Sequence, residues 1–365
     1  MHWKSGDIRS NPPAWQKAAQ GGGLMFHEVA KSELSAGAVV ATSGRVKRRA
    51  GEAGRSIEVR ALQTTLKAPV GFTGTGLHSG RPVRMTLRPA SAEYGIWFRR
   101  TDITGRDALI PGRWDAVVEA RLCTRVANAA GVEVSTIEHL MAALAGCGVH
   151  NVLVEIDGPE VPILDGSAAP FVRAILARGL RTLDTPVRVL RVLDVVEVRE
   201  GDAWARIAPA PTLEIDFAID FADAAIGRQH KALSLANGAF VRELSDSRTF
   251  CRKADVDAMR ASGLALGGTM ENAVVVDGDR VLTPGGLRHA DEPVRHKMLD
   301  ALGDLALAGA PLLGRYTGYR AGHALTNRLL RALFARPEAF RMSLCGPETE
   351  GRLPGAGLRP TDILA

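Results

Sequence analysis

The stretch VSTIEHLMAALAGCGVHNVLVEIDG (residues 134–158) contains the two patterns from which the fold class follows. Its first part is an apolar run that predicts a helix near 135–146. Its last part, NVLVEIDG, alternates in the manner of a half-buried strand. The strand pattern recurs in PVRMTLRPA (82–90) and LEIDFAIDF (213–221). Further helical stretches are predicted near 167–179, 238–246, 252–262, 293–308 and 322–335. We therefore predict an α+β fold.

Composition and one proline divide the chain into four parts. Residues 1–60 are rich in glycine, alanine, serine and charge, and we expect a basic, mostly disordered extension there. Pro186 disfavours helix at the residue before it and is followed by a strand-rich segment, so it marks a boundary. We expect α+β domains at 61–186 and 187–345. The tail, 346–365, contains proline and glycine and is expected to be irregular.

Charge and hydropathy argue against several classes of protein. The formal net charge is +6, but residues 1–60 hold ten Lys or Arg against five Asp or Glu, so the rest of the chain is nearly neutral. This placement gives little support to a nucleic-acid partner, and we expect none. The sequence contains no run of about 18 apolar residues for a membrane span and no apolar region of a signal peptide. We therefore expect a cytoplasmic protein.

The stretch RHKMLDALGD (295–304) places a row of polar side chains on an otherwise apolar helix. His296, Asp300 and Asp304 recur every fourth residue and so lie near one helical face. Charge rows on helices usually face solvent, and on this stretch alone we favour that interpretation. The alternative is a metal site, because a histidine and an aspartate four residues apart can share one ion.

A second histidine follows a helix-start signal. Ser135 and Glu138 in STIE fit the capping-box pattern, which by itself accounts for Glu138. It does not account for His139, which leads into an apolar helix. A single histidine of this kind is more often a satisfied core residue than a ligand. The functional alternative makes His139 a metal ligand and Glu138 a base beside the metal-bound water.

Three further stretches carry weaker signals. In GYRAGHALTN, His323 is either a helix-start residue or a general acid. GFTGTGLHSG departs from the glycine spacing of a dinucleotide site and lacks the GK[ST] of a phosphate loop, so we interpret it as a tight turn that presents His78. DSRTFC contains Thr249 and Phe250 but by itself predicts almost nothing.

Taken together, these stretches resemble the UDP-3-O-acyl-N-acetylglucosamine deacetylases, zinc amidases that catalyse the committed step of lipid A synthesis in Gram-negative bacteria. The resemblance runs in the family's order over residues 62–335, and several motifs of this length are very specific. The motifs are GTGLHSG (74–80), VSTIEHLMAALAGCGVHNVLVEIDGPEVPILDGSAAPF (134–171), SRTF (247–250), VRHKMLDALGD (294–304) and GHALTN (322–327). The extension and the tail lie outside the resemblance.

The resemblance implies a metal centre with an acid and a base. His139, His296 and Asp300 would bind Zn²⁺, a ligand set that suits a catalytic zinc with an open position. Glu138 would take the proton from the zinc water. His323 would be protonated and would donate to the leaving amine.

The resemblance also implies supporting roles. Asp304 would hold the catalytic histidine in place, and Thr249 would stabilise the oxyanion together with zinc. Lys297 would face the substrate diphosphate. Phe250 and His78 would line the nucleotide-sugar side of the site.

The fold that the resemblance implies is two tandem α+β halves, each a sheet packed on helices with one insert. The second insert, expected within about 249–277, would form a hydrophobic passage for an acyl chain. The implied reaction is hydrolysis of the N-acetyl amide of UDP-3-O-(3-hydroxyacyl)-N-acetylglucosamine. This substrate is the expected partner of a monomer without a membrane span, and the basic extension is a candidate for peripheral contact with a membrane.

Three alternatives stay open beside this interpretation. A relative that acts on another N-acetylated nucleotide sugar should differ in the acyl passage. An inactive regulator or nucleotide-sugar binding protein has no need of the complete set of acid, base and ligands. A nucleic-acid binding protein would rest on the basic extension alone. The metal is also open, because histidine and carboxylate ligands suit both zinc and iron.

Overall fold

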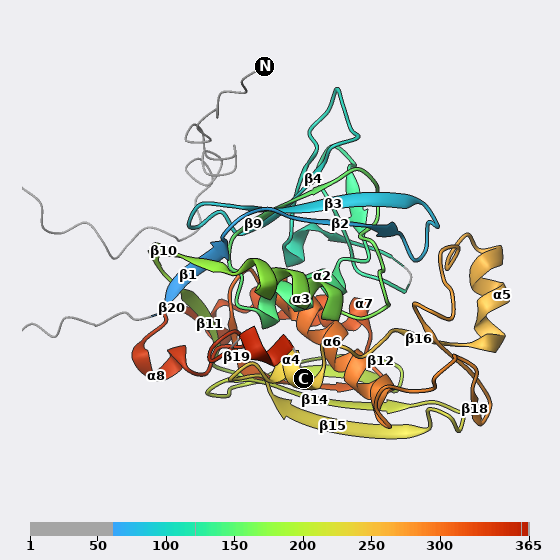
Figure 1. Ribbon diagram of the computed structural model, residues 1–365. Coiled ribbons are helices and arrows are strands. Elements are labelled where there is room, and N and C mark those ends of the chain that lie inside the picture. The colour runs from blue at the N-terminus through green and yellow to red at the C-terminus, as the bar shows by residue number, and fades with distance from the viewer. Residues whose placement is uncertain (1–60, 121, 359, 364–365) are drawn as a thin grey trace, which may run out of the picture. The chain divides into compact units, whose positions relative to one another are not determined.

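Figure 1 shows several helices of this protein lying between two β-sheets. The computed structural model describes residues 61–120, 122–358 and 360–363. The extension expected for residues 1–60 lies outside the described residues, so its disorder stays a prediction. None of the helices in the described ranges has the length and apolar character needed to cross a membrane.

One large sheet is built from five strands of the first half of the chain. In β3 (Pro82–Pro89), Val83, Met85 and Leu87 are buried and the residues between them are exposed or half-buried, which is the alternation predicted from the sequence. β9 (Val152–Ile156) pairs antiparallel with β3, so both predicted strands are confirmed. The order across the sheet is β2 (Val70–Thr75), β3, β9, β4 (Ile96–Arg100) and β5 (Leu109–Pro111).

The other large sheet has seven strands from the second half of the chain. β14 (Leu213–Asp220) is the predicted LEIDFAIDF strand, and every second residue from Leu213 to Ile219 is buried. β14 runs parallel to β19 (Leu312–Tyr319). The other strands are β11 (Arg188–Val192), β12 (Val196–Glu200), β13 (Ala203–Ala208), β15 (Arg228–Ser234) and β20 (Phe340–Leu344).

Four helices lie between the two sheets and contribute side chains to the core, and a short fifth helix lies beside them. The five are α2 (Glu138–Gly146), α3 (Ala169–Arg178), α4 (Ala239–Glu243), α6 (Glu292–Ala306) and α7 (His323–Phe334). Each coincides with a helical stretch predicted from the sequence, so the α+β class is confirmed. One hydrophobic cluster takes residues from both halves, among them Leu140, Met298 and Leu329. The division into two domains at Pro186 stays a prediction.

Smaller sheets and helices complete the described residues. Two three-stranded sheets are separate from the large ones. Along the chain, one falls between β5 and α2 and the other between α4 and α6. The first holds β6 (Val117–Val118), β7 (Arg125–Ala127) and β8 (Glu133–Ser135); the second holds β16 (Phe250–Arg252), β17 (Val274–Asp277) and β18 (Arg280–Val281), with α5 (Lys253–Ala261). The remainder are β1 (Leu62–Leu66), β10 (Leu180–Pro186), α8 (Pro347–Glu350), η1 (Trp114–Ala116), η2 (Pro337–Ala339) and η3 (Pro360–Ile363).

A close crossing of α2 and α6 sets the position of the site. At Gly303 of α6, a Cβ would approach the carbonyl oxygen of Glu138 closer than the 3.0 Å that real Cβ atoms keep. The glycine therefore allows the backbone of α6 to touch the first turn of α2.

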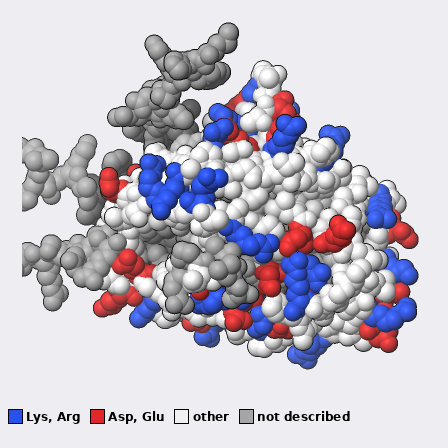
Figure 2. Space-filling view, viewed as in Figure 1, with Lys and Arg blue, Asp and Glu red and all other residues white. Residues whose placement is uncertain are grey.

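The surface of the described residues carries both signs of charge. Figure 2 shows Lys and Arg interspersed with Asp and Glu over the face in view. Several of these charges form exposed ion pairs, such as Arg315 with Glu214 and Arg336 with Glu338. This surface agrees with a nearly neutral body whose net positive charge lies mainly in residues 1–60.

Candidate active site

Two histidines and an aspartate from two helices meet in one buried cluster. His139 comes from the first turn of α2, and His296 and Asp300 come from α6. Each offers a ligand atom, and these atoms lie within 4.8 Å of one another. The Nε2 atoms of His139 and His296 lie 3.6 and 3.4 Å from Asp300 Oδ1. The residues that sequence reasoning placed on a metal therefore lie close enough to share one.

The hydrogen bonds of the cluster leave the facing atoms of His296 and Asp300 without protons. His296 Nδ1 lies 3.0 Å from the carbonyl oxygen of Ser247, to which it donates, so its Nε2 carries a lone pair. Asp300 Oδ1 is buried and has no hydrogen-bond partner among the described residues. A buried acceptor left unpaired costs free energy. A divalent cation between these atoms would remove that cost, and the donor set fits a metal ion on this observation.

Burial and neighbouring charges keep His296 and Asp300 in the protonation states that a metal would require. Burial lowers the pKa of His296 to about 4, although Asp300 opposes it. Burial would raise the pKa of Asp300, but the surrounding positive charge, with Lys297 in direct contact, outweighs it and holds that pKa well below its usual range. Lys297 Nζ donates to Asp300 Oδ2 at 2.7 Å. The imidazole of His296 is therefore neutral and the carboxylate of Asp300 is charged near neutral pH.

A second group of side chains beside the cluster forms an acid–base pair. His323, the first residue of α7, places Nε2 3.7 Å from Glu138 Oε1. Its Nδ1 donates to Asp304 Oδ2 at 2.8 Å. Thr124 joins the two carboxylates, since its N–H donates to Glu138 Oε2 at 3.0 Å and its hydroxyl to Asp304 Oδ1 at 2.5 Å.

The two members of this pair have pKa values that are shifted by their surroundings. Burial raises the pKa of Glu138, opposed by His323 and His139. Burial would lower the pKa of His323, but the charges of Asp304 and Glu138 outweigh it and raise that pKa to about 9. His323 is therefore a cation at neutral pH, a state suited to an acid.

Thr249 and Phe250 lie on the side of the cluster formed by β16. Both side chains are half-buried. The ring of Phe250 lies 6.2 Å from the ring of His296, edge to face. The backbone of Thr249 donates to the carbonyl of Gly166 at 2.8 Å and accepts from the N–H of Val274 at 2.8 Å. These bonds fix the segment that carries the predicted oxyanion residue.

His78 lies in the tight turn predicted for GTGLHSG and is buried. A single carboxylate holds this turn: Glu160 accepts the N–H groups of His78 and Ser79 and the hydroxyl of Thr136, each at 2.8 Å. Burial lowers the pKa of His78, and Glu160 opposes that shift while His323 adds to it. The turn is thereby tied to the residues just before α2.

The capping-box interpretation of STIE is wrong. Ser135 ends β8, where its N–H donates to the carbonyl of Pro159, and α2 begins only at Glu138. The carboxylate of Glu138 bonds to the N–H of Thr124 instead of capping its own helix. Sequence reasoning also missed Thr124 and Glu160, because neither contact leaves a local pattern in the sequence.

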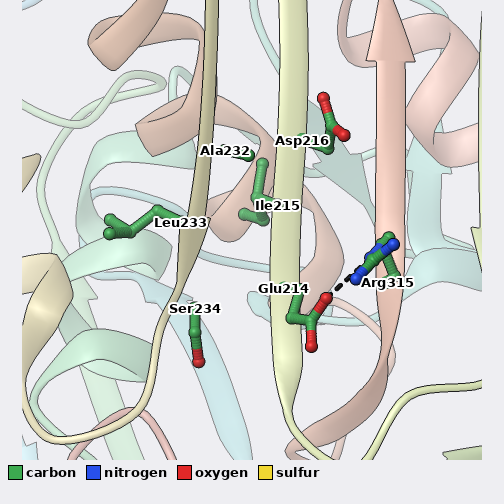
Figure 3. A pocket seen from close by; sticks show the side chains of 7 residues that line it. All are labelled: Glu214, Ile215, Asp216, Ala232, Leu233, Ser234 and Arg315. Carbon is green, nitrogen blue, oxygen red and sulfur yellow. Dashed lines mark hydrogen bonds and ion pairs between the residues drawn. The ribbon is translucent and has the colours of Figure 1, made fainter.

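A pocket of about 410 Å³ lies away from this cluster, over strands β14, β15 and β19 (Figure 3). Its lining residues are Glu214, Ile215, Asp216, Ala232, Leu233, Ser234 and Arg315. Arg315 Nε donates to Glu214 Oε2 at 2.6 Å, so these two charges neutralise each other. The pocket shares no residue with the buried cluster and is no part of the candidate site.

Comparison with known proteins identifies the family of this chain. Residues 63–335 match the model of the UDP-3-O-acyl N-acetylglycosamine deacetylase family. A UDP-3-O-acyl-N-acetylglucosamine deacetylase of Phenylobacterium zucineum is 54% identical over 281 residues, which cover 77% of this chain and 96% of that protein. Proteins of the same name from Shewanella woodyi and Shewanella oneidensis are each 46% identical over 283 residues, covering 77% of this chain and 92% of theirs. The chain belongs to the UDP-3-O-acyl N-acetylglycosamine deacetylase family.

Proposed function

We propose that this protein hydrolyses the N-acetyl amide of UDP-3-O-(3-hydroxyacyl)-N-acetylglucosamine to the free amine and acetate, the committed step of lipid A synthesis. Family membership over residues 63–335 supports the reaction. The observation that carries the mechanism is the unpaired Asp300 Oδ1 between two histidine Nε2 atoms, beside the Glu138–His323 pair. A protein that only bound nucleotide sugars would have no use for this complete set.

His139, His296 and Asp300 are the residues that would hold the metal, for which we propose zinc. A zinc ion there would polarise the acetyl carbonyl and make the attacking water more acidic. The buried neutral histidine and the charged carboxylate match the ligand states that such an ion needs. Iron suits the same donors, and metal analysis of the protein distinguishes the two.

Glu138 and His323 divide the proton transfers. Glu138 takes a proton from the water as the water's oxygen bonds to the acetyl carbon. His323 then gives its proton to the amine nitrogen as the carbon–nitrogen bond breaks, because an amine leaves well only when protonated. Asp304 holds the acid through its 2.8 Å bond to Nδ1, which directs Nε2 toward Glu138.

The remaining predicted residues would contact the substrate. Thr249 is half-buried on a segment fixed by backbone hydrogen bonds, as an oxyanion donor requires. Phe250 packs beside His296 and His78 lies in the turn held by Glu160, and we assign both to the nucleotide-sugar side. Lys297 pairs with Asp300 in this structure, and its charge would face the diphosphate.

The chain between Thr249 and Asp277 supports a passage for the acyl group. It contains β16, α5 and β17, and Leu266 and Met270 between α5 and β17 are 53% and 45% exposed. Apolar side chains left in solvent fit a hydrocarbon ligand. The acylated substrate and UDP-N-acetylglucosamine should therefore be processed at very different rates.

The test is acetate release from these two compounds, with metal analysis of the same protein sample. We expect about one metal ion per chain and turnover of the acylated compound at a kcat/KM at least 100-fold higher. Equal kcat/KM values for the two compounds would rule out a role for the acyl passage. Bound metal without acetate from either compound would move the substrate to another N-acetyl sugar.

A further inference from the structure

A buried ion pair joins the start of α6 to the segment 247–250. Glu292 opens α6 and is 0% exposed, and Arg248 is 7% exposed. Glu292 Oε1 accepts the backbone N–H of Arg248 and its Nε, both at 2.9 Å, and Oε2 accepts Nη2 at 3.2 Å. Oε2 also accepts the N–H of Arg288 at 2.6 Å. One carboxylate thus holds a side chain and two stretches of backbone.

The residues on either side of Arg248 are the ones that reach the candidate site. The carbonyl of Ser247 accepts from His296 Nδ1 at 3.0 Å. Thr249 is the predicted oxyanion donor. Glu292, His296 and Asp300 follow at intervals of four on α6, so they lie near the same helical face. The bond from Glu292 to Arg248 therefore fixes the distance between Ser247 and the helix that carries His296.

We propose that Glu292 and Arg248 are positioning residues that set the orientation of His296 through the carbonyl of Ser247 and place Thr249 beside the metal. The proposal rests on the proposed function, because it concerns the ligand set of that metal. Without the pair, the segment keeps backbone bonds from Ser247 to Leu244 and from Thr249 to Gly166 and Val274. None of these bonds joins the segment to α6, so none sets the distance between the carbonyl of Ser247 and His296.

The chemistry of the Glu292–Arg248 pair favours a role in positioning the segment 247–250 over a role in stabilising the whole fold. A buried ion pair is weak support for stability, since apolar residues of similar size often serve as well. A carbonyl that orients a ligating histidine acts directly on the metal, and loss of such a partner typically costs 10–100-fold in metal affinity or activity. Nη2 of Arg248 also donates to the carbonyl of Gly286 at 2.7 Å, so one guanidinium joins α6 to a second stretch of backbone.

The test measures binding of Co²⁺ alone to the full chain, by its visible absorption, and then kcat and KM. We expect Glu292→Gln to weaken Co²⁺ binding at least tenfold, to change the absorption spectrum, and to lower kcat more than it raises KM. Asp291→Asn is the matched control. Asp291 directly precedes the same helix and pairs with Arg295 and Lys231, and no bond joins it to residues 247–250. It should leave the affinity and the spectrum unchanged.

A folded Glu292→Gln variant with Co²⁺ affinity within tenfold of wild type and an unchanged spectrum would overturn the proposal. If this variant does not fold, Arg248→Lys decides, because it keeps the charge pair and loses only the planar fork. We expect at least threefold weaker Co²⁺ binding with an altered spectrum, and a smaller change without a spectral difference would overturn the proposal. Failure of wild type to bind Co²⁺ would instead reject the metal site of the proposed function.

Discussion

Single hydrogen bonds decide how the acid and the base of this site are held. Thr124 reaches both carboxylates, Glu138 through its N–H and Asp304 through its hydroxyl. Asp304 in turn bonds to His323. The hydroxyl of Thr124 therefore supports His323, the proposed acid, through Asp304.

Thr124→Val removes this hydroxyl without changing the size of the side chain. We expect kcat to fall on the order of tenfold, because Asp304 loses a donor and orients His323 less well. The unfolding free energy should fall by about 1–3 kcal/mol from the unpaired buried carboxylate oxygen. Thr124→Ser keeps the hydroxyl and should retain most of kcat. Steady-state kinetics check both variants, and a Val variant with wild-type kcat would remove Thr124 from the account.

His150 predicts a pH dependence of stability away from the active site. Burial lowers its pKa to about 4, and Nδ1 accepts the N–H of Thr64 at 3.1 Å. Because the unfolded chain, with a pKa near 6.5, binds the proton first, the stabilisation is complete above pH 6.5 and is lost as pH falls toward 4. The loss should be roughly 2–3 kcal/mol.

Denaturant unfolding of wild type and His150→Gln between pH 7 and 4 measures this effect. The Gln variant should lose less unfolding free energy over that range. His230→Gln is the control, since His230 is exposed and pairs with Asp216. Parallel pH curves for wild type and His150→Gln would show that His150 is not the titrating group.

At the scale of elements, the crossing of α2 and α6 brings the three proposed metal ligands together. His139 stands on one helix, His296 and Asp300 on the other, and Gly303 lets the two backbones touch. A wider crossing would separate Nε2 of His139 from Asp300 Oδ1, which now lie 3.6 Å apart. Metal binding and helix packing are therefore coupled at this point.

Gly303→Ala tests this coupling, because helix propensity and the clash predict opposite changes in the unfolding free energy. Helix propensity alone predicts a gain of about 1 kcal/mol from alanine. The clash with the carbonyl of Glu138 predicts a loss of about 1–3 kcal/mol or more, together with weaker metal binding. Gly322→Ala is the control, because nothing lies within 4 Å of its Cβ position. Thermal unfolding and metal titration measure both effects, and a stabilised Gly303→Ala variant would contradict the close crossing.

The sequence predicted elements well where the pattern is local. The strands at 82–90, 151–158 and 213–221 and the helices around them carry periodic burial, so their spacing alone identifies them. The capping box failed because Ser135 is held by strand pairing with distant residues. The short strands of β6 and β18, two residues each, carry no periodicity, and the order of strands in each sheet depends on contacts far apart in the chain.

The candidate site shows the same difference between local patterns, which the sequence reveals, and long-range contacts, which it does not. His296 and Asp300 share a helix, so their proximity follows from spacing of four. The meeting of His139 with His296 joins residues more than 150 positions apart, and family resemblance supplied it, not any local pattern. Thr124 and Glu292 act through hydrogen bonds that leave no trace in composition or periodicity, and only the structure reveals them.

At the scale of the whole molecule, the family match and the described structure start together, near residue 61. The carbonyl of Ala61 accepts the N–H of Val187, and the match begins at residue 63. A chain that begins at Ala61 should keep kcat/KM within twofold and the same metal content as the full chain. Acetate release and metal analysis of the two forms check this. Lost activity in a folded truncated chain would assign a catalytic role to the extension.

The most direct test of the central claim compares a variant of one proposed metal ligand with a variant of a histidine outside the cluster. His296→Ala removes a proposed metal ligand, whereas His289→Ala removes a half-buried histidine that pairs with Asp246 outside the cluster. Acetate release and bound metal are measured on the same folded samples supplied with zinc. We expect His296→Ala to lose the bound metal and at least 1000-fold in kcat/KM. We expect His289→Ala to keep the metal and the wild-type kcat/KM. Normal acetate release by His296→Ala, or no bound metal in active wild type, would contradict it.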